Sequence, residues 1–245
     1  MKVVLSAPAV VQVLVRVLAL VTALAPLSCT TPVSGPTLSP TVLPDDYSIR
    51  YVALGDSYTI GTSVPVNERW PDQLVVRVGA TVALEPVDNL AANGASSSDV
   101  ILSQLPGLAE LQPDFVTLLI GVNDVVRGVP ESTYQANVGQ ILAALVEIVP
   151  ADRIVVVSTP DYTRTPRGAD YGDRAQQRAQ ITRFNDIMGS AAVLRGIAFV
   201  DISTVADLAE GDPSLVAADQ LHPSGSQYAR WVDLIAPVVE DLLRQ

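Results

Sequence analysis

The sequence predicts a doubly wound α/β domain with a parallel sheet, and three observations carry this prediction. From residue 49 onward, short runs rich in β-branched residues alternate about five times with longer segments of helical period. Two of the short runs, residues 115–120 and 154–158, are nearly continuously apolar, which is typical of strands covered on both faces. The body that follows the atypical N-terminus has about 200 residues, which suits one domain with a full core.

Five strands are expected, at residues 49–54, 87–91, 115–120, 154–158 and 197–201. The segments between them are long enough for the helical crossovers that parallel strands require. No internal repeat and no second domain is visible in the sequence. Ligands of such sheets bind beyond the carboxyl ends of the strands, so functional residues are expected in the loops that follow them.

The spacing of apolar residues also places three helices. A capping box at Ser132–Gln135 precedes apolar residues three and four apart, so one helix is expected to begin there. A second helix is expected over Asp173–Leu194, with Gly196 past its end. The last helix carries an apolar stripe over residues 228–242, and Pro237 within it is expected to bend or split the helix.

The N-terminus is predicted to be an export signal, residues 1–28. Lys2 precedes an apolar stretch that is short and carries a charge near its middle, which argues against a permanent membrane span. Residues 29–46 are rich in Pro, Ser and Thr, a composition that forms an extended tether. The folded domain is therefore expected to span residues 47–245.

Cys29 follows Pro26-Leu27-Ser28, a run that resembles a bacterial lipobox, in which the cysteine becomes the lipid-carrying N-terminus. Pro26 stands where the pattern prefers an aliphatic residue. The alternative is a soluble secreted protein in which Cys29 is incidental. We favour the lipoprotein, so the chain is expected to be exported and to meet the membrane only through this anchor.

Composition excludes several classes of protein. The net charge is −11 and no cluster of Lys and Arg occurs, which disfavours nucleic-acid binding. The single lysine, Lys2, lies in the signal, so Schiff-base and P-loop chemistry are excluded. With one His and one Cys, the chain has no intrachain disulfide and no zinc site built on those ligands. No spacing suggests an all-carboxylate metal site, and no cofactor is expected.

Ser57 stands directly after the first expected strand, in the run Gly55-Asp56-Ser57-Tyr58. A serine on a tight strand-to-helix turn exposes its hydroxyl, but it becomes a useful nucleophile only when a base removes its proton. Taken alone, the run has an ordinary explanation, because Asp and Ser commonly cap helices that follow strands.

His222, the one histidine of the chain, lies in Asp219-Gln220-Leu221-His222-Pro223, just before the last expected helix. Pro223 suits the first turn of that helix. The Asp219 carboxylate can reach the imidazole Nδ1–H if the loop folds back, which would fix the tautomer and stabilise the imidazolium. For an isolated Asp-x-x-His, a surface histidine beside a helix-capping aspartate is the simpler interpretation.

Two more runs follow expected strands: Asn93-Gly94 after the second, and Gly121-Val122-Asn123-Asp124 after the third. In acyl transfer, negative charge develops on a carbonyl oxygen, and preorganised N–H donors must stabilise it. The Asn123 amide and the N–H groups of Gly94 and Ser57 would converge there from three strand ends. Turn chemistry explains each run alone, but four such runs at strand ends in one chain favour the catalytic interpretation.

These four runs resemble the signature blocks of the SGNH/GDSL hydrolase family, the GDSL-type esterases and lipases, and they span residues 55–223. The resemblance implies a three-layer α/β/α, flavodoxin-like fold with a doubly wound five-stranded parallel sheet. It implies Ser57 as nucleophile, His222 as base and Asp219 as the acid that orients the base. It also implies an oxyanion hole formed by the Ser57 N–H, the Gly94 N–H and Asn123.

At two positions the sequence is less typical of this family, and it lacks the motif of one other hydrolase superfamily. Gln220 stands where the family frequently has glycine, and Asn93 precedes the glycine of the second block. The separate α/β-hydrolase superfamily is disfavoured because no Gly-x-Ser-x-Gly elbow occurs in the chain.

The expected activity is hydrolysis of small-molecule carboxylic esters, with short acyl groups, through an acyl-serine intermediate. The alternatives are lysophospholipase or lipase-like activity, acyl transfer to an alcohol, and a non-catalytic surface-binding lipoprotein. The complete triad argues against the last of these, and no protein partner is implied. No long apolar insertion that would serve as a lid is present.

Three segments are candidates for the walls of the substrate site. Trp70 and the loop Thr62–Asn67 are candidates for the acyl side, although Trp70 is equally compatible with core packing. The segment Tyr162–Asp173, which contains Arg164, Arg167 and Arg174, is a candidate for the leaving-group side. Its favoured alternative is a solvated loop.

Overall fold

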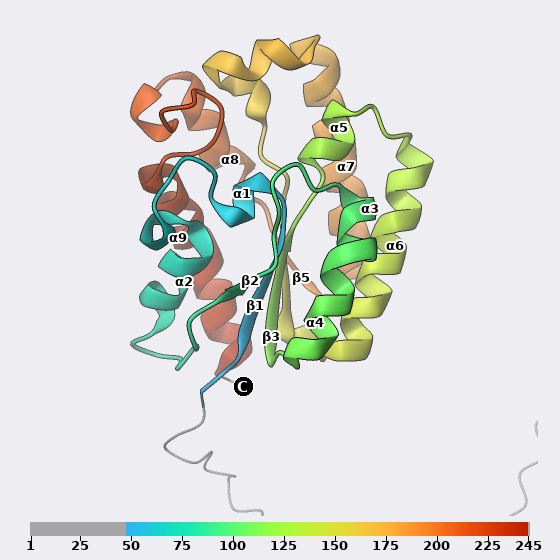
Figure 1. Cartoon of the computed structure of the whole chain (residues 1–245), viewed down its shortest axis with the longest axis vertical. Coiled ribbons are helices and arrows are strands. Elements are labelled where there is room, and N and C mark those ends of the chain that lie inside the picture. Colours follow the sequence, from blue (N-terminus) through green and yellow to red (C-terminus); the bar gives the residue numbers. More distant parts are fainter. Residues whose placement is uncertain (1–47, 245) are drawn as a thin grey trace, which may run out of the picture. The chain divides into compact units, whose positions relative to one another are not determined.

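The protein is described by a computed structural model, in which residues 48–244 are placed. One sheet of five parallel strands has the order β2-β1-β3-β4-β5, which is the flavodoxin-like order of a doubly wound sheet (Figure 1). The predicted fold class is therefore confirmed. The predicted signal segment, Cys29 and the tether over residues 29–46 lie outside the described residues and stay predictions.

The strands agree with the predicted ones in number and order. Their bounds are β1 Tyr51–Gly55, β2 Asp88–Asn89, β3 Phe115–Leu119, β4 Ile154–Val157 and β5 Ala198–Val200. Every residue of β1, β3 and β4 is buried, as their apolar runs predict for strands covered on both faces. The two edge strands are shorter than predicted, and β2 pairs with β1 only through Asp88 and Asn89.

The helices lie on both faces of the sheet. Their bounds are α1 Ser57–Ile60, α2 Trp70–Val78, α3 Ser97–Asp99, α4 Leu105–Leu111, α5 Val122–Val126, α6 Glu131–Ile148, α7 Arg174–Val193, α8 Ser203–Ala206 and α9 Gly225–Leu243. Helices α2 and α9 pack on one face, and α4, α6 and α7 cover the other (Figure 1). This gives the three layers expected of a doubly wound domain.

Shorter helical turns fill the connections. They are η1 Val66–Glu68, the π-helical η2 Val100–Gln104, η3 Ala151–Arg153, η4 Tyr162–Arg164, η5 Pro166–Tyr171, η6 Asp207–Glu210 and η7 Pro213–Leu215. Several of them follow the carboxyl ends of β4 and β5, so the segments that leave this end of the sheet are compact rather than extended.

The second predicted helix is confirmed, but the predicted start of the first is wrong. Helix α7 has Asp173 as its N-cap, and the Asp173 side chain accepts a hydrogen bond from the Gln176 amide. Helix α6 begins at Glu131, and its N-cap is Pro130, with no side-chain cap bond. Pro130 already sets the entry of the chain into α6, so Ser132 lies inside the first turn and forms no capping box.

The last helix differs from the prediction at two prolines. Helix α9 continues from Gly225 to Leu243 through Pro237, so Pro237 does not split it. Its N-cap is Ser224, which places Pro223 just before the helix instead of in the first turn. Pro223 instead forms an antiparallel bridge with Val216, which ties the His222 loop back on itself.

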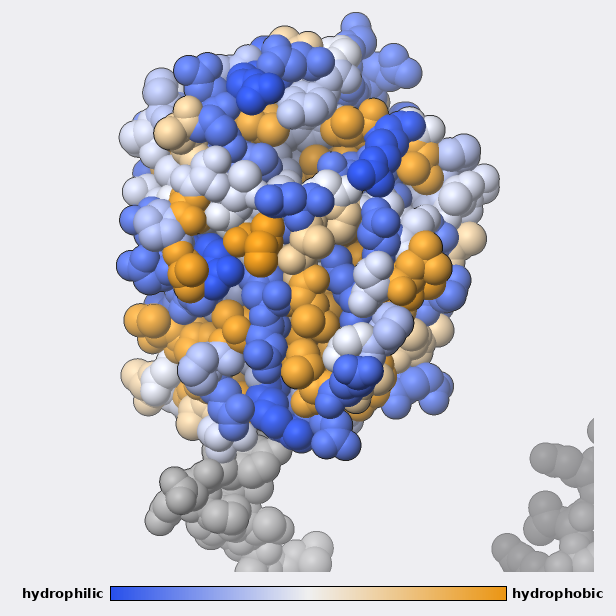
Figure 2. Space-filling model, viewed as in Figure 1, coloured by the Kyte–Doolittle hydropathy of each residue, from blue (hydrophilic) through white to orange (hydrophobic). Residues whose placement is uncertain are grey.

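The surface of the described residues carries few large apolar side chains. Val76 and Leu102 are among the exposed ones. On the face shown in Figure 2, hydrophobic residues lie between hydrophilic ones. No helix within residues 48–244 combines the length and apolar character that a membrane span needs.

Candidate active site

The carboxyl ends of β1 and β3 lie in register, with Gly55 paired to Leu119, so the loops that follow them meet. A cavity of about 290 Å³ opens at this end of the sheet. It is lined by Ser57, Tyr58, Thr62, Asn93, Gly94, Val122, Asn123, Val126, Tyr162, Tyr171, Leu221 and His222. Four of the five predicted site residues are in this lining, and the fifth, Asp219, contacts His222 from outside it.

Ser57 is the first residue of α1, in the tight turn that the sequence predicts. Gly55 ends β1 with a φ of +154°, and a Cβ at this position would lie 2.4 Å from the Leu119 carbonyl oxygen. Only glycine fits this close approach between the turn and β3. Asp56 caps α1, since its Oδ1 accepts the Tyr58 N–H at 2.9 Å.

A buried glutamine fixes the same turn from the neighbouring helical segment. The Gln104 Oε1 accepts the Gly55 N–H at 2.9 Å, and the Gln104 Nε2 donates to the Gly55 carbonyl at 2.7 Å. Both backbone groups of Gly55 are therefore paired in the core, where an unpaired amide would cost free energy. No motif in the sequence pointed to Gln104.

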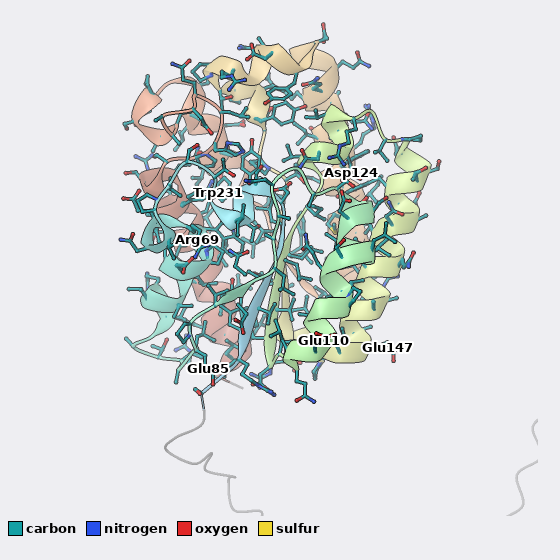
Figure 3. The ribbon with its side chains drawn as sticks, viewed as in Figure 1. Arg69, Glu85, Glu110, Asp124, Glu147 and Trp231 are labelled. Carbon is teal, nitrogen blue, oxygen red and sulfur yellow. The ribbon has the colours of Figure 1, made fainter. Side chains whose placement is uncertain are left out.

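Ser57, His222 and Asp219 form a continuous line of hydrogen-bonding atoms. The Ser57 Oγ lies 2.9 Å from His222 Nε2, and His222 Nδ1 lies 2.6 Å from Asp219 Oδ2. The imidazole also packs against the Tyr58 ring, with 5.1 Å between centroids. Trp231 of α9 stacks behind Tyr58, and Figure 3 shows it beside α1. Such packing limits the ring to few orientations.

The Asp219 carboxylate accepts four hydrogen bonds. Its Oδ1 accepts the backbone N–H groups of Leu221 and His222, both at 3.0 Å. Its Oδ2 accepts from His222 Nδ1 and, at 2.7 Å, from the Ser63 hydroxyl. Partial burial acts to raise the pKa of Asp219, but these hydrogen bonds outweigh it and hold the pKa well below its ordinary value.

Gly94 and Asn123 line the cavity beside Ser57, and each is held by a hydrogen bond that leaves a donor available. Gly94 has a φ of +77°, a left-handed conformation that favours glycine. Its carbonyl oxygen accepts from Arg127 Nη2 at 2.6 Å. The Asn123 Nδ2 donates one of its two hydrogens to the Ala95 carbonyl at 2.9 Å. The sequence offered no signal for Arg127.

Asp124 joins the loops after β2 and β3. It is fully buried and accepts the Ser97 N–H at 2.8 Å and the Ser97 hydroxyl at 2.5 Å. Burial raises the pKa of Asp124, and the two bonds from Ser97 oppose that rise. Figure 3 shows Asp124 at the carboxyl end of the sheet, while Glu85, Glu110 and Glu147 lie toward the opposite end. Asp124 therefore supports the wall that carries Gly94 and Asn123.

One wall of the cavity is apolar and aromatic. Val122 and Val126 come from α5, and Tyr162 and Tyr171 come from the predicted segment Tyr162–Asp173. The two tyrosine rings meet edge to face at 5.8 Å. Thr62, from the predicted loop Thr62–Asn67, also reaches the cavity. The loop Thr62–Asn67 therefore contributes Thr62 to the site. The favoured interpretation of Tyr162–Asp173 as a solvated loop is wrong for Tyr162 and Tyr171, which line the cavity.

The other side chains proposed for the substrate walls lie elsewhere. Trp70 is fully buried in the hydrophobic core and is absent from the cavity lining. Arg164 pairs with Asp161, Asp207 and Glu210, and Arg167 pairs with Asp170. Arg174 donates to backbone carbonyls of the same segment. The three arginines thus brace the loop and do not line the site.

The arrangement can perform acyl-transfer chemistry without further groups. A hydroxyl bonded to an imidazole, itself bonded to an ionised carboxylate, permits proton removal from the hydroxyl. Backbone and amide N–H donors beside that hydroxyl can stabilise the negative charge that develops on a carbonyl oxygen. Within residues 48–244, no group of three His, Cys, Asp or Glu side chains gathers closely enough to bind a metal ion.

Comparison with known proteins finds a matching family and one curated relative. The profile of the GDSL-like lipase/acylhydrolase family matches residues 53–230. An arylesterase from Vibrio mimicus is 29% identical over 103 residues, which are 40% of this chain and 49% of that protein. The match therefore spans about half the length of that relative.

Two solved structures illustrate the shared fold. One is the lipase/acylhydrolase from Enterococcus faecalis, with a TM-score of 0.64, 20% identity, and coverage of 80% of this chain and 97% of that one. The other is an acetylxylan esterase from Geobacillus stearothermophilus, with a TM-score of 0.59, 17% identity, and coverage of 80% and 94%. At these identities the likeness concerns the fold alone.

Proposed function

Since the chain belongs to the GDSL-like lipase/acylhydrolase family, we propose that it is a carboxylic ester hydrolase that cleaves short-chain esters through an acyl-serine intermediate. One observation carries the proposal: the line of hydrogen-bonding atoms from Ser57 through His222 to Asp219, at the wall of a small cavity. In this proposal Ser57 is the nucleophile, His222 the base and Asp219 the acid that orients the base.

In the first step the Ser57 Oγ attacks the ester carbonyl carbon, and its proton moves to His222 Nε2. Negative charge develops on the carbonyl oxygen, which accepts hydrogen bonds from the Ser57 N–H, the Gly94 N–H and the Asn123 amide. The carbon–oxygen bond to the alcohol then breaks. The departing alcohol takes the proton from His222, and the acyl group stays on Ser57.

In the second step water attacks the acyl-serine carbonyl and gives its proton to His222 Nε2. The same donors receive the charge, the bond to Ser57 breaks, and Ser57 regains the proton as the carboxylic acid leaves. Asp219 stays ionised throughout and stabilises the imidazolium at each stage. This role is supported by its lowered pKa and by its direct contact with His222 Nδ1.

The size and lining of the cavity support short acyl groups. A volume of about 290 Å³ is near the lower end of the range of small-molecule sites. The lining combines valine and tyrosine side chains with the polar groups of Asn93 and Asn123. A relative is an arylesterase and a fold neighbour is an acetylxylan esterase, so aryl acetates and acetylated xylo-oligosaccharides are suitable first substrates.

The proposal is tested by ester hydrolysis with wild type and Ser57→Ala. Wild type should hydrolyse p-nitrophenyl acetate and butyrate faster than the octanoate, and a fluorophosphonate should label it. Ser57→Ala should lose the label and lower kcat/KM by at least about 10⁴-fold. Unchanged hydrolysis by Ser57→Ala would remove the acyl-serine mechanism.

Three other outcomes would change the proposed substrate, acceptor or activity. A preference for octanoate over acetate would replace the short-chain assignment with a lipase-like one. Ester formation in the presence of a competing alcohol would identify an acyltransferase. No turnover and no label in wild type would favour a non-catalytic binding protein.

A further inference from the structure

Ser63 connects the two parts of the chain that carry the candidate triad. Its hydroxyl donates to Asp219 Oδ2 at 2.7 Å, across 156 residues of sequence. The other three donors to Asp219 belong to Leu221 and His222, in the same loop as Asp219. Among the four hydrogen bonds, the one from Ser63 alone anchors the carboxylate to another segment.

The segment that carries Ser63 is itself bonded to Ser57. The N–H groups of Gly61 and Thr62 both donate to the Ser57 carbonyl oxygen, at 3.1 and 3.0 Å. Ser63 follows directly, and its hydroxyl reaches the oxygen that also receives His222 Nδ1. A chain of short contacts therefore runs from the backbone of Ser57 through Ser63 to Asp219, parallel to the contact through His222.

The backbone at Ser63 points to a functional constraint. Ser63 has a φ of 67°, and within residues 48–244 only Ser63, Gln112 and Gln220 are non-glycine residues with a positive φ. A left-handed conformation disfavours serine relative to glycine or asparagine, and such strain gathers at functional sites. Two of these three residues either bond Asp219 or follow it directly in sequence.

We propose that Ser63 is a positioning residue, whose hydroxyl holds the Asp219 carboxylate in the orientation that directs His222 Nε2 at the Ser57 hydroxyl. This inference rests on the proposed esterase mechanism. Ser63 and Asp219 are both absent from the cavity lining, so Ser63 acts through Asp219 and His222 and not through substrate. Its loss should therefore lower kcat and leave KM nearly unchanged.

Ser63→Gly is the decisive variant, because glycine accepts the left-handed backbone and removes the hydroxymethyl side chain that bonds Asp219. Gln112→Gly is the matched control, since it makes the same kind of change at a φ of 48° at the end of α4, toward the amino end of β3. Both variants should have melting temperatures close to that of wild type, because the relief of left-handed strain is offset by the greater freedom of the unfolded chain. In ester hydrolysis, Ser63→Gly should lower kcat about tenfold with KM within twofold, and Gln112→Gly should match wild type.

A second readout does not depend on turnover. His222 is the one histidine of the chain, so its Nδ1 proton gives an unambiguous NMR resonance. With Nδ1 2.6 Å from Asp219 Oδ2, this resonance should lie far downfield in wild type. In Ser63→Gly it should broaden through faster exchange with water, because Asp219 gains freedom, and in Gln112→Gly it should stay sharp.

The inference is overturned if Ser63→Gly keeps wild-type kcat, or if kcat falls while the His222 resonance is unchanged. A fall in kcat shared by Gln112→Gly would also overturn it, since strain relief alone would then explain the effect. Absence of ester hydrolysis in wild type would instead defeat the proposed function. The NMR comparison would still decide whether Ser63 orients Asp219.

Discussion

The serine turn, residues 55–60, and the histidine loop, residues 217–223, deliver their side chains to the same cavity by different means. The serine turn continues the internal strand β1, and both backbone groups of Gly55 are bonded by the buried Gln104. The histidine loop has no strand behind it. It is closed by the bond from the Ala217 N–H to the His222 carbonyl at 2.8 Å and by the contacts of Asp219.

Each region contains one aspartate, and the pKa values of the two are shifted in opposite directions. Asp56 is fully buried, and its Oδ1 accepts the Tyr58 N–H while Oδ2 has no partner among the described residues. Burial raises the pKa of Asp56 to about 7, helped by the nearby charge of Asp124 and opposed by the bond from Tyr58. Asp219, 23% exposed, accepts four hydrogen bonds and has a lowered pKa.

The difference between Asp56 and Asp219 shows that burial and hydrogen-bond donors together set the pKa of a carboxyl group at this end of the sheet. Asp56 has a raised pKa and serves the fold as a helix cap. Asp219 stays ionised and serves as an acceptor for His222. The same substitution, Asp→Asn, should therefore act mainly on kcat in the histidine loop and mainly on stability in the serine turn.

The largest effect is expected for Asp219→Asn. An amide in place of the carboxylate cannot stabilise the imidazolium and favours the wrong tautomer of His222, so kcat should fall about 10³- to 10⁴-fold. Ester hydrolysis at pH 7.5 measures this, and Asp56→Asn is the control, with kcat within about tenfold of wild type. A larger loss in Asp56→Asn than in Asp219→Asn would reverse the assignment of the two carboxylates.

Asp56→Asn should change how the free energy of unfolding depends on pH. Because the pKa of Asp56 is raised on folding, the folded protein holds a proton between about pH 4 and pH 7 that the unfolded chain has released. The bound proton stabilises the folded state, and this stabilisation is lost as the pH rises from about 4 to about 7.

The amide of the Asp56→Asn variant does not titrate in this range, so the pH dependence of its stability should be flatter. The wild type should lose up to about 3 kcal/mol relative to the variant between pH 5 and pH 8. Urea unfolding of both proteins at the two pH values measures this difference. Parallel stability curves would show that Asp56 is ionised throughout.

The smallest effect is expected for Gln220→Gly in the histidine loop. Gln220 has a φ of 65°, and glycine removes the left-handed strain while adding freedom to the unfolded chain. The free energy of unfolding should change by less than about 1 kcal/mol, and kcat should stay within twofold. Thermal unfolding and ester hydrolysis measure both, and a tenfold fall in kcat would assign the Gln220 side chain a part in the site.

The sequence predicted the fold class, the five strands and the three longest helices because these depend on local patterns. Continuous apolar runs identified β3 and β4, and the spacing of apolar residues identified α7. The predicted capping box at Ser132 was wrong because Pro130 already caps α6. Of the two outcomes predicted at Pro237, a bend or a split of the helix, the split is wrong because α9 continues through Pro237, packed against α2 and β5.

The sequence by itself determined which side chains are available for chemistry: a single histidine, an aspartate three residues before it, and Ser57, Gly94 and Asn123 after expected strands. Only the tertiary structure decided that Ser63 bonds Asp219, that Gln104 holds Gly55, and that the pKa values of Asp56 and Asp219 are shifted in opposite directions. The physical reason is that residue type and spacing are local properties, whereas burial and hydrogen-bond partners depend on segments up to 156 residues apart meeting in the folded protein.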